Sequence, residues 1–137
     1  MPYHLLIADD DVGVLRFLRD TLASLAPDCH VDATPSPEHA FELALKRHYD
    51  LFIFDLAMPG MDGALLYRLI RIVFDTSDPP IPPVPPLLLL TGQGGAPAAQ
   101  QLLTEPGVRG LLAKPFTIER LLRQLERCLP GIGSGGP

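Results

Sequence analysis

Five short apolar runs recur along this chain, and they restrict its fold more than any other feature. The runs span residues 4–8, 29–33, 51–55, 87–91 and 108–113. The first run does not alternate polar with apolar residues, which is the pattern of a strand covered on both faces. Because helix-length segments separate the runs, we expect an α/β fold in which right-handed crossovers build a central parallel sheet.

The segments between the runs have the periodicity of amphipathic helices. In the first of them, Val14, Leu15 and Leu18 recur at the three- and four-residue spacing that places side chains on one helix face. Ser36 and Pro37 are residue types typical of an N-cap and a first helical position. The predicted helices span residues 12–25, 37–47, 64–74, 98–104 and 117–129.

The length of 137 residues fits a single domain with its own core and leaves no room for a second one. We assign residues 1–130 to this domain and the glycine-rich residues 131–137 to a flexible tail or linker. Residues 79–86 contain six prolines, so we expect an extended, polyproline-like connection there. A stiff loop is the favoured interpretation of this segment, and a ligand for a proline-recognising domain is the alternative.

Charge and cysteine content exclude several classes of function. The net charge of −5 argues against direct nucleic-acid binding, which depends on Lys and Arg contacting phosphates. Cys29 and Cys128 lack a CxxC arrangement and a secretion signal, so we expect reduced thiols. The apolar stretches are too short for a membrane span. The sequence therefore predicts a cytoplasmic protein that does not enter a membrane.

Polar side chains end or follow four of the apolar runs. Asp9 and Asp10 come directly after the first run, Asp55 and Thr91 close the third and fourth, and Lys114 follows the fifth. Because the carboxyl ends of parallel strands meet at the same edge of a sheet, we expect these side chains to lie close together. Taken singly, each has an ordinary alternative role as a helix cap, a strand residue or a surface charge. Their shared position at successive strand ends favours one site.

This combination of side chains suits phosphorylation of a carboxylate. The reaction needs a nucleophilic oxygen, which we assign to Asp55, and a cation that offsets the charge of the transferring group. Asp9 and Asp10 offer the oxygen ligands that Mg²⁺ prefers. Lys114 can contact phosphoryl oxygens as a point charge, and Thr91 can donate a hydroxyl hydrogen bond. If phosphorylation draws Thr91 inward, the following helix shifts and the surface changes.

The chain resembles the receiver domains of two-component response regulators, in particular the single-domain, chemotaxis-type receivers. The resemblance covers residues 4–129, and residues 6–11, 55–63 and 113–116 carry it most specifically. It implies a flavodoxin-like three-layer sandwich, in which five helices surround a doubly wound, five-stranded parallel sheet with strand order 2-1-3-4-5. It also implies that the Lys114–Pro115 peptide bond is cis.

The resemblance also implies a function. Asp55 would accept a phosphoryl group from a histidine kinase or a phosphotransfer protein. Asp10, Asp55 and the backbone carbonyl of Ala57 would bind Mg²⁺, with Asp9 completing the acidic pocket. Such a protein is a phosphoacceptor in signal transduction and not an enzyme, although it assists its own phosphorylation and dephosphorylation. Downstream effector proteins often bind the face of the fourth helix, fifth strand and fifth helix, through which a homodimer could also form.

Three alternatives stay open at this stage. Leu111 stands where many receivers carry an aromatic ring, and Gly92 stands where alanine is usual. These departures leave open a receiver-like interaction scaffold that works without phosphorylation, although the complete set of site residues argues against it. A Mg²⁺-dependent phosphatase with an aspartyl-phosphate intermediate would need a general acid two residues after the nucleophile, where this chain has Ala57. A flavin binder would need a hydroxyl-rich phosphate loop after the first strand, where this chain has three aspartates.

Overall fold

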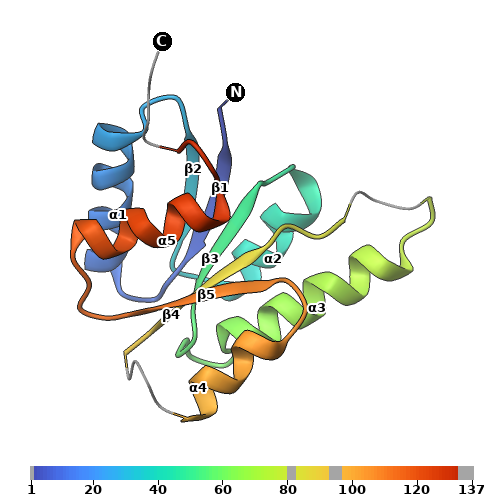
Figure 1. The fold of residues 1–137 in the computed structure, drawn as a ribbon. Coiled ribbons are helices and arrows are strands. Elements are labelled where there is room, and N and C mark those ends of the chain that lie inside the picture. Colours follow the sequence, from blue (N-terminus) through green and yellow to red (C-terminus); the bar gives the residue numbers. More distant parts are fainter. Residues whose placement is uncertain (1, 80–82, 93–96, 133–137) are drawn as a thin grey trace.

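A five-stranded parallel sheet forms the centre of the computed structural model, which describes residues 2–79, 83–92 and 97–132 (Figure 1). The strand order is β2-β1-β3-β4-β5, which confirms the predicted order. The strands are β1 (His4–Ala8), β2 (His30–Thr34), β3 (Leu51–Asp55), β4 (Leu87–Thr91) and β5 (Val108–Ala113).

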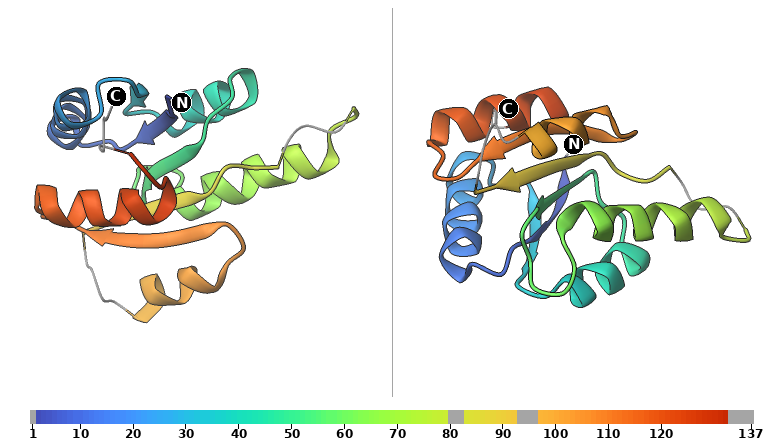
Figure 2. Two further views of the ribbon diagram at one scale, coloured as in Figure 1. Left: turned by 45° about the horizontal axis from the view of Figure 1, so that its top comes forward. Right: turned by 90° about the horizontal axis from the view of Figure 1, so that it is seen from below.

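Helices cover both faces of this sheet (Figure 2). They are α1 (Val12–Leu25), α2 (Pro37–Lys46), α3 (Gly63–Thr76), α4 (Pro97–Gln101) and α5 (Ile118–Cys128), and a 3₁₀ turn at Leu102–Thr104 follows α4. Helices α1 and α5 lie on one side of the sheet, and α2 and α3 lie on the other. This arrangement is the predicted three-layer sandwich.

The apolar runs are explained by this double cover. Successive side chains of a strand point to opposite faces. On β1, Leu5 and Ile7 therefore pack in the core below α1 and α5, whereas Leu6 and Ala8 pack in the core below α2 and α3. All four side chains are fully buried, so none of these four positions favours a polar residue.

Most element boundaries agree with the predicted ones within one residue, and three of the differences have a visible structural form. The predicted strand at 29–33 lies one residue later, because the Cys29 N–H closes a turn onto the Ala26 carbonyl at 2.9 Å. Helix α3 is longer than predicted and ends at Thr76. The predicted helix at 98–104 divides into α4 and the 3₁₀ turn.

The proline-rich connection ends in fixed contacts with the sheet. Residues 80–82 lie outside the described residues. Beyond them, the carbonyl of Pro85 accepts the buried Tyr67 hydroxyl at 2.6 Å, and the carbonyl of Pro86 accepts the Phe52 N–H at 3.0 Å. Both the Asp78–Pro79 and the Lys114–Pro115 bonds are cis, and the second was predicted.

The ordered chain continues beyond the boundary predicted at residue 130. Ile132 is only 3% exposed and packs in the core formed with α1 and α5, because its apolar side chain fits there. Residues 133–137 of the predicted tail lie outside the described residues. In the described ranges, no helix is long and apolar enough to cross a membrane.

Candidate functional site

The carboxyl ends of the strands bring the five predicted site residues to one edge of the sheet. Asp9 and Asp10 follow β1, Asp55 ends β3, and Lys114 follows β5. Thr91 ends β4 one residue after Leu90, the register partner of Asp55. The Lys114 N–H also donates to the Thr91 carbonyl at 2.7 Å, which ties the last two strand ends together. The common edge predicted for these residues is therefore present.

Three carboxylates form the acidic part of the site. One oxygen from each of Asp9, Asp10 and Asp55 lies within 4.8 Å of the other two. Asp9 and Asp55 are buried, with exposed fractions of 0% and 3%, whereas Asp10 is exposed. Hard oxygen ligands at this spacing suit a divalent cation such as Mg²⁺. Such a cation would also relieve the repulsion between the buried carboxylates.

Lys114 lies between the two buried carboxylates. Its Nζ atom is 2.7 Å from Asp9 Oδ2 and 3.4 Å from Asp55 Oδ1. The other oxygen of Asp9, Oδ1, accepts the backbone N–H of Asp11 at 2.9 Å. Both carboxylate oxygens of Asp9 therefore already contact other groups of the protein. The exposed carboxylate of Asp10 is better placed than that of Asp9 to bind a cation directly.

The electrostatics of the site act on the protonation of Asp55. Burial and the nearby charge of Asp9 raise the pKa of Asp55 to about 6, although Lys114 and the Ala57 N–H favour its ionised form. Burial opposes the charge of Lys114, but its ion pairs with Asp9 and Asp55 outweigh burial and raise the pKa of Lys114. At neutral pH the site thus holds an ionised Asp55 beside a protonated lysine.

Gly63 is a site residue that sequence reasoning did not single out. It begins α3, whose N-cap Asp62 accepts the Leu65 N–H at 2.7 Å. A Cβ atom on Gly63 would lie 2.5 Å from the Asp55 carbonyl oxygen and 2.9 Å from the Phe54 Cβ. Glycine thus lets α3 start directly against the strand end that carries Asp55. Its place directly before the predicted helix at 64–74 was the available signal.

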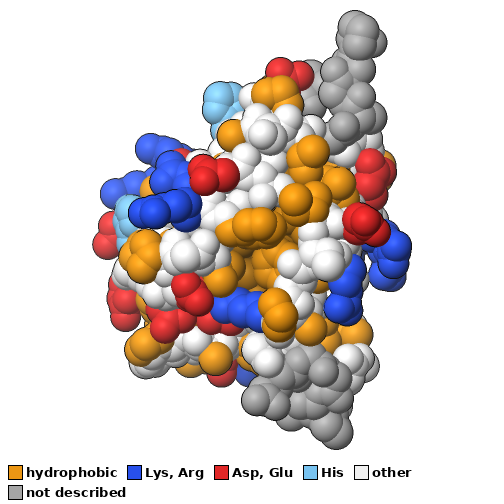
Figure 3. All heavy atoms as spheres, turned by 90° about the vertical axis from the view of Figure 1, so that its left-hand side faces the viewer, with side chains coloured by type: hydrophobic (Ala, Val, Ile, Leu, Met, Phe, Trp, Pro, Cys, Tyr) orange, Lys and Arg blue, Asp and Glu red, His pale blue; other side chains and the backbone are white. Residues whose placement is uncertain are grey.

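An apolar groove borders Lys114 on the same edge. Its volume is about 490 Å³, and its lining includes Val14, Phe17, Pro115 and Phe116. The rings of Phe17 and Phe116 meet edge to face with centroids 5.8 Å apart. Figure 3 shows hydrophobic side chains gathered in the middle of this side of the molecule, with acidic and basic side chains beside them. The site therefore opens next to an apolar surface that a partner protein could contact.

A fold of this kind with this cluster at its carboxyl edge defines a receiver-type signalling domain, and comparison with known proteins agrees. The family model of the response regulator receiver domain matches residues 5–126. The chain belongs to this family.

Individual relatives come from several bacteria. The chain is 33% identical over 132 residues to a chemotaxis protein CheY homolog of Campylobacter jejuni, covering 96% of this chain and 95% of that protein. It is also 33% identical over 141 residues to the response regulator protein FleR of Pseudomonas aeruginosa, of which it covers 28%. Among solved structures, Vibrio cholerae chemotaxis protein CheY4 superposes with a TM-score of 0.77 at 27% identity, covering 94% of this chain and all of CheY4. The resemblance to CheY-like response regulator receivers is therefore confirmed.

Proposed function

We propose that this receiver domain takes a phosphoryl group onto Asp55 and thereby switches a surface that a downstream protein recognises. The observation that carries the proposal is the contact of Lys114 with both buried carboxylates, 2.7 Å from Asp9 and 3.4 Å from Asp55. The Lys114 ammonium group lies close enough to contact the free Asp55 carboxylate and, after phosphorylation, the oxygens of a phosphoryl group bonded to Asp55.

The proposed transfer is an in-line displacement. An oxygen of ionised Asp55 forms a bond to phosphorus while the phosphorus–nitrogen bond of a donor phosphohistidine breaks, and the imidazole nitrogen keeps the electron pair of that bond. Asp10, Asp55 and the Ala57 carbonyl would hold Mg²⁺, which offsets charge on the phosphoryl oxygens when bound. Hydrolysis of the aspartyl phosphate by water resets the domain.

The readout of phosphorylation would run through Thr91. Its position at the end of β4, beside the register partner of Asp55, puts a hydroxyl donor next to the phosphorylated strand end. A hydrogen bond from this hydroxyl to the phosphoryl group would pull the chain that leads into α4. Leu111 lies half-buried on β5 with its side chain in the core under α3, so the switch would work without an aromatic ring at that position.

The apolar groove beside Lys114 supports a protein as the phosphoryl donor. Asp55 is 3% exposed, so the donor group must approach closely and its carrier must rest on the surrounding surface. Phe17 is 39% exposed and Val12 is 64% exposed near this entrance. A histidine kinase or phosphotransfer protein would cover these side chains during transfer.

Phosphorylation can be tested on the full chain with acetyl phosphate and with beryllofluoride, both in Mg²⁺. We expect a mass increase of one phosphoryl group with acetyl phosphate and amide chemical-shift changes around Asp55, Thr91 and Lys114 with beryllofluoride. Asp55→Asn removes the nucleophile, so we expect neither signal while the circular dichroism spectrum stays the same.

Asp75→Asn is the matched control, because Asp75 is an exposed aspartate near the other end of α3. It should take up phosphate like the unchanged chain. Labelling of the Asp55→Asn variant would disprove the assignment of the nucleophile. A chain that takes up neither reagent would instead be a receiver-like scaffold that binds partners without phosphorylation.

A further inference from the structure

A second cavity lies at the edge of the sheet opposite to Asp55. It is formed where α2 ends, where α3 ends and where residues 83–86 lead into β4, and its volume is about 190 Å³. These three segments precede the amino ends of β3 and β4. We call this hollow the α2–α3 cavity. It shares no lining residue with the groove beside Lys114.

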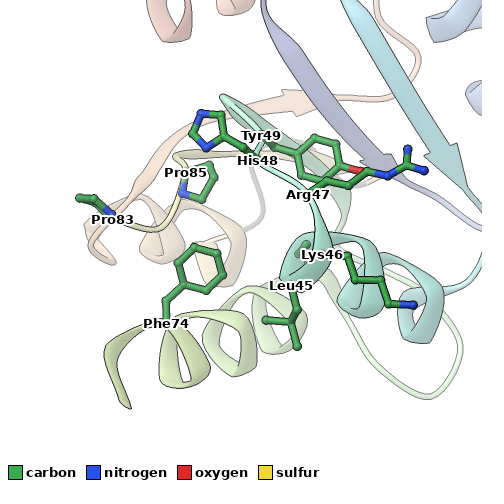
Figure 4. A pocket seen from close by; sticks show the side chains of 9 residues that line it. Leu45, Lys46, Arg47, His48, Tyr49, Phe74, Pro83 and Pro85 are labelled. Atoms are coloured by element: carbon green, nitrogen blue, oxygen red, sulfur yellow. The ribbon is translucent and has the colours of Figure 1, made fainter. Parts of the chain in front are cut away.

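The walls of the α2–α3 cavity are mainly apolar. Leu45 of α2, Phe74 of α3 and the rings of Pro83 and Pro85 line it. In Figure 4 the phenyl ring of Phe74 points toward Pro85, with His48 at the rim. Leu45 is 40% exposed, so an apolar surface continues from the cavity onto α2. An apolar group that entered the cavity would be removed from water and would contact these apolar side chains.

Hydrogen bonds hold the walls of the cavity in place. The buried Tyr67 hydroxyl fixes Pro85 through its carbonyl at 2.6 Å. On the other side, the Tyr49 hydroxyl donates to Asp32 Oδ2 at 2.6 Å, and the Tyr49 ring packs near Phe52 with centroids 6.0 Å apart. A cavity with fixed walls needs little reorganisation when it is filled, and this favours binding.

The size of the cavity restricts what can fill it. Sites for whole small-molecule ligands are roughly 300–1,000 Å³, and this cavity is about 190 Å³. It is large enough for one bulky apolar side chain and too small for a cofactor. Single apolar anchors that fill a fixed pocket supply much of the affinity at many protein interfaces. The geometry therefore favours one side chain of a partner protein.

The rim of the cavity indicates the charge of that partner. Lys46, Arg47 and His48 are consecutive and exposed there. Arg47 pairs with Asp32 at 3.0 Å, and His48 lies 3.5 Å from Asp50. Lys46 makes no ion pair with any residue in ranges 2–79, 83–92 and 97–132. Among the described rim residues, Lys46 is therefore the cation that stays available to an acidic group, on a chain whose net charge is −5.

We propose that the α2–α3 cavity binds an acidic segment of a partner protein, which inserts one bulky apolar side chain and places carboxylates near Lys46. In Figure 4, Lys46 extends away from the cavity, where it would meet residues flanking the inserted side chain. Because the cavity and Asp55 lie at opposite edges of the sheet, this partner would leave the phosphoacceptor accessible. The domain could therefore stay attached to the partner while its phosphorylation changes.

The proposal can be tested with two short peptides and the full ¹⁵N-labelled chain. One peptide has a phenylalanine flanked on each side by two glutamates, and the other has alanine in place of the phenylalanine. We expect the first to shift the amide signals of Lys46, His48 and Val84 and to bind at least about tenfold more tightly than the second, because the ring is buried on binding.

A charge reversal at the rim provides the second arm. Lys46→Glu should weaken binding of the phenylalanine peptide by about fivefold, an effect of the size typical of exposed charge pairs. Arg123→Glu makes the same change on α5 at an exposed position outside the cavity and should leave binding unchanged. Beryllofluoride should still shift the Asp55 region in both variants, so a failure of phosphorylation is separate from a failure of this proposal.

Several results would overturn the proposal. These are an absence of shifts at the cavity, equal binding of the alanine peptide, and equal effects of the two charge reversals. Amide shifts at the cavity that grow with protein concentration in the absence of peptide would assign it to a second copy of the chain instead.

Discussion

Lys114 is the residue on which the electrostatics of the site depends. Its ammonium contacts Asp9, whose carboxylate is fully buried, and it lies within 3.4 Å of Asp55. A buried carboxylate that loses its partner is much less stable than one that is paired, because the protein interior solvates charge poorly. The same lysine thus stabilises the resting fold, and in the proposed function it would contact the incoming phosphoryl group.

Replacing Lys114 with methionine, which is uncharged and nearly as long, should destabilise the metal-free protein by about 3 kcal/mol, since Asp9 would keep a buried, unpaired charge. Added Mg²⁺ should recover part of this loss by binding beside the carboxylates. Urea unfolding in EDTA and in Mg²⁺ measures both effects. Lys46→Met is the control, because Lys46 is exposed, and it should change stability little. Equal losses in the two variants would contradict a structural role of the Lys114 charge.

The raised pKa of Asp55, about 6, has a consequence for stability in the absence of metal. An unfolded aspartate has a pKa of about 3.9, so the folded protein binds the proton more tightly. This group therefore destabilises the metal-free fold progressively as pH rises from about 4 to about 6. Urea unfolding across this pH window in EDTA should show a decrease in the free energy of unfolding. The decrease should be smaller in the Asp55→Asn variant. Identical profiles would contradict the raised pKa of Asp55.

At the scale of elements, the start of α3 positions the strand end that carries Asp55. The helix begins at Gly63, and the Gly63 N–H donates to the Leu56 carbonyl at 3.3 Å. A side chain at this position would collide with the backbone of Asp55, which cannot move independently because Leu56 donates its own N–H to Leu90 at 2.8 Å. The helix, the loop and two strands therefore form one rigid unit around the candidate nucleophile.

Gly63→Ala should destabilise the fold by about 1–3 kcal/mol, the usual range for overpacking, and should slow uptake of phosphate from acetyl phosphate. Gly92→Ala is the matched control. A Cβ atom on Gly92 would meet no atom of the described residues within 4 Å, so this change should have little effect on stability. Thermal unfolding and mass spectrometry measure the two properties. A stable Gly63→Ala variant with normal uptake would show that the backbone of Asp55 adapts easily.

At the scale of the whole molecule, the two ends of the described chain meet beside the first strand (Figure 1). The Tyr3 hydroxyl donates to the Pro130 carbonyl at 2.6 Å. Ile132 then packs into the core between the sheet and the helices α1 and α5. The residues that follow α5 therefore complete the core on that face, which includes Leu5 and Ile7 of β1.

Ile132→Ala should lower the free energy of unfolding by about 2–4 kcal/mol, because it leaves a cavity in the core. Beryllofluoride binding in Mg²⁺ should persist in the folded fraction, since Ile132 follows Pro130, which lies beside Tyr3 before β1, whereas the site is at the carboxyl ends of the strands. Ile118→Ala is the control, as Ile118 is 45% exposed and should contribute far less. Chemical denaturation measures the free energy of unfolding of both variants. A smaller loss of stability in Ile132→Ala than in Ile118→Ala would contradict the packing of Ile132.

The sequence by itself determined the strands, most of the helix boundaries and the five polar residues that meet at the candidate site. Apolar runs, helical spacing and the position of Asp55 or Thr91 at a strand end are local patterns, and a parallel sheet brings such ends to one edge. Only the tertiary structure decided that both oxygens of Asp9 are engaged, that Gly63 packs against Asp55, and that Ile132 is buried. Each of these depends on contacts between residues brought together by packing, and local patterns in a sequence do not encode which atoms meet.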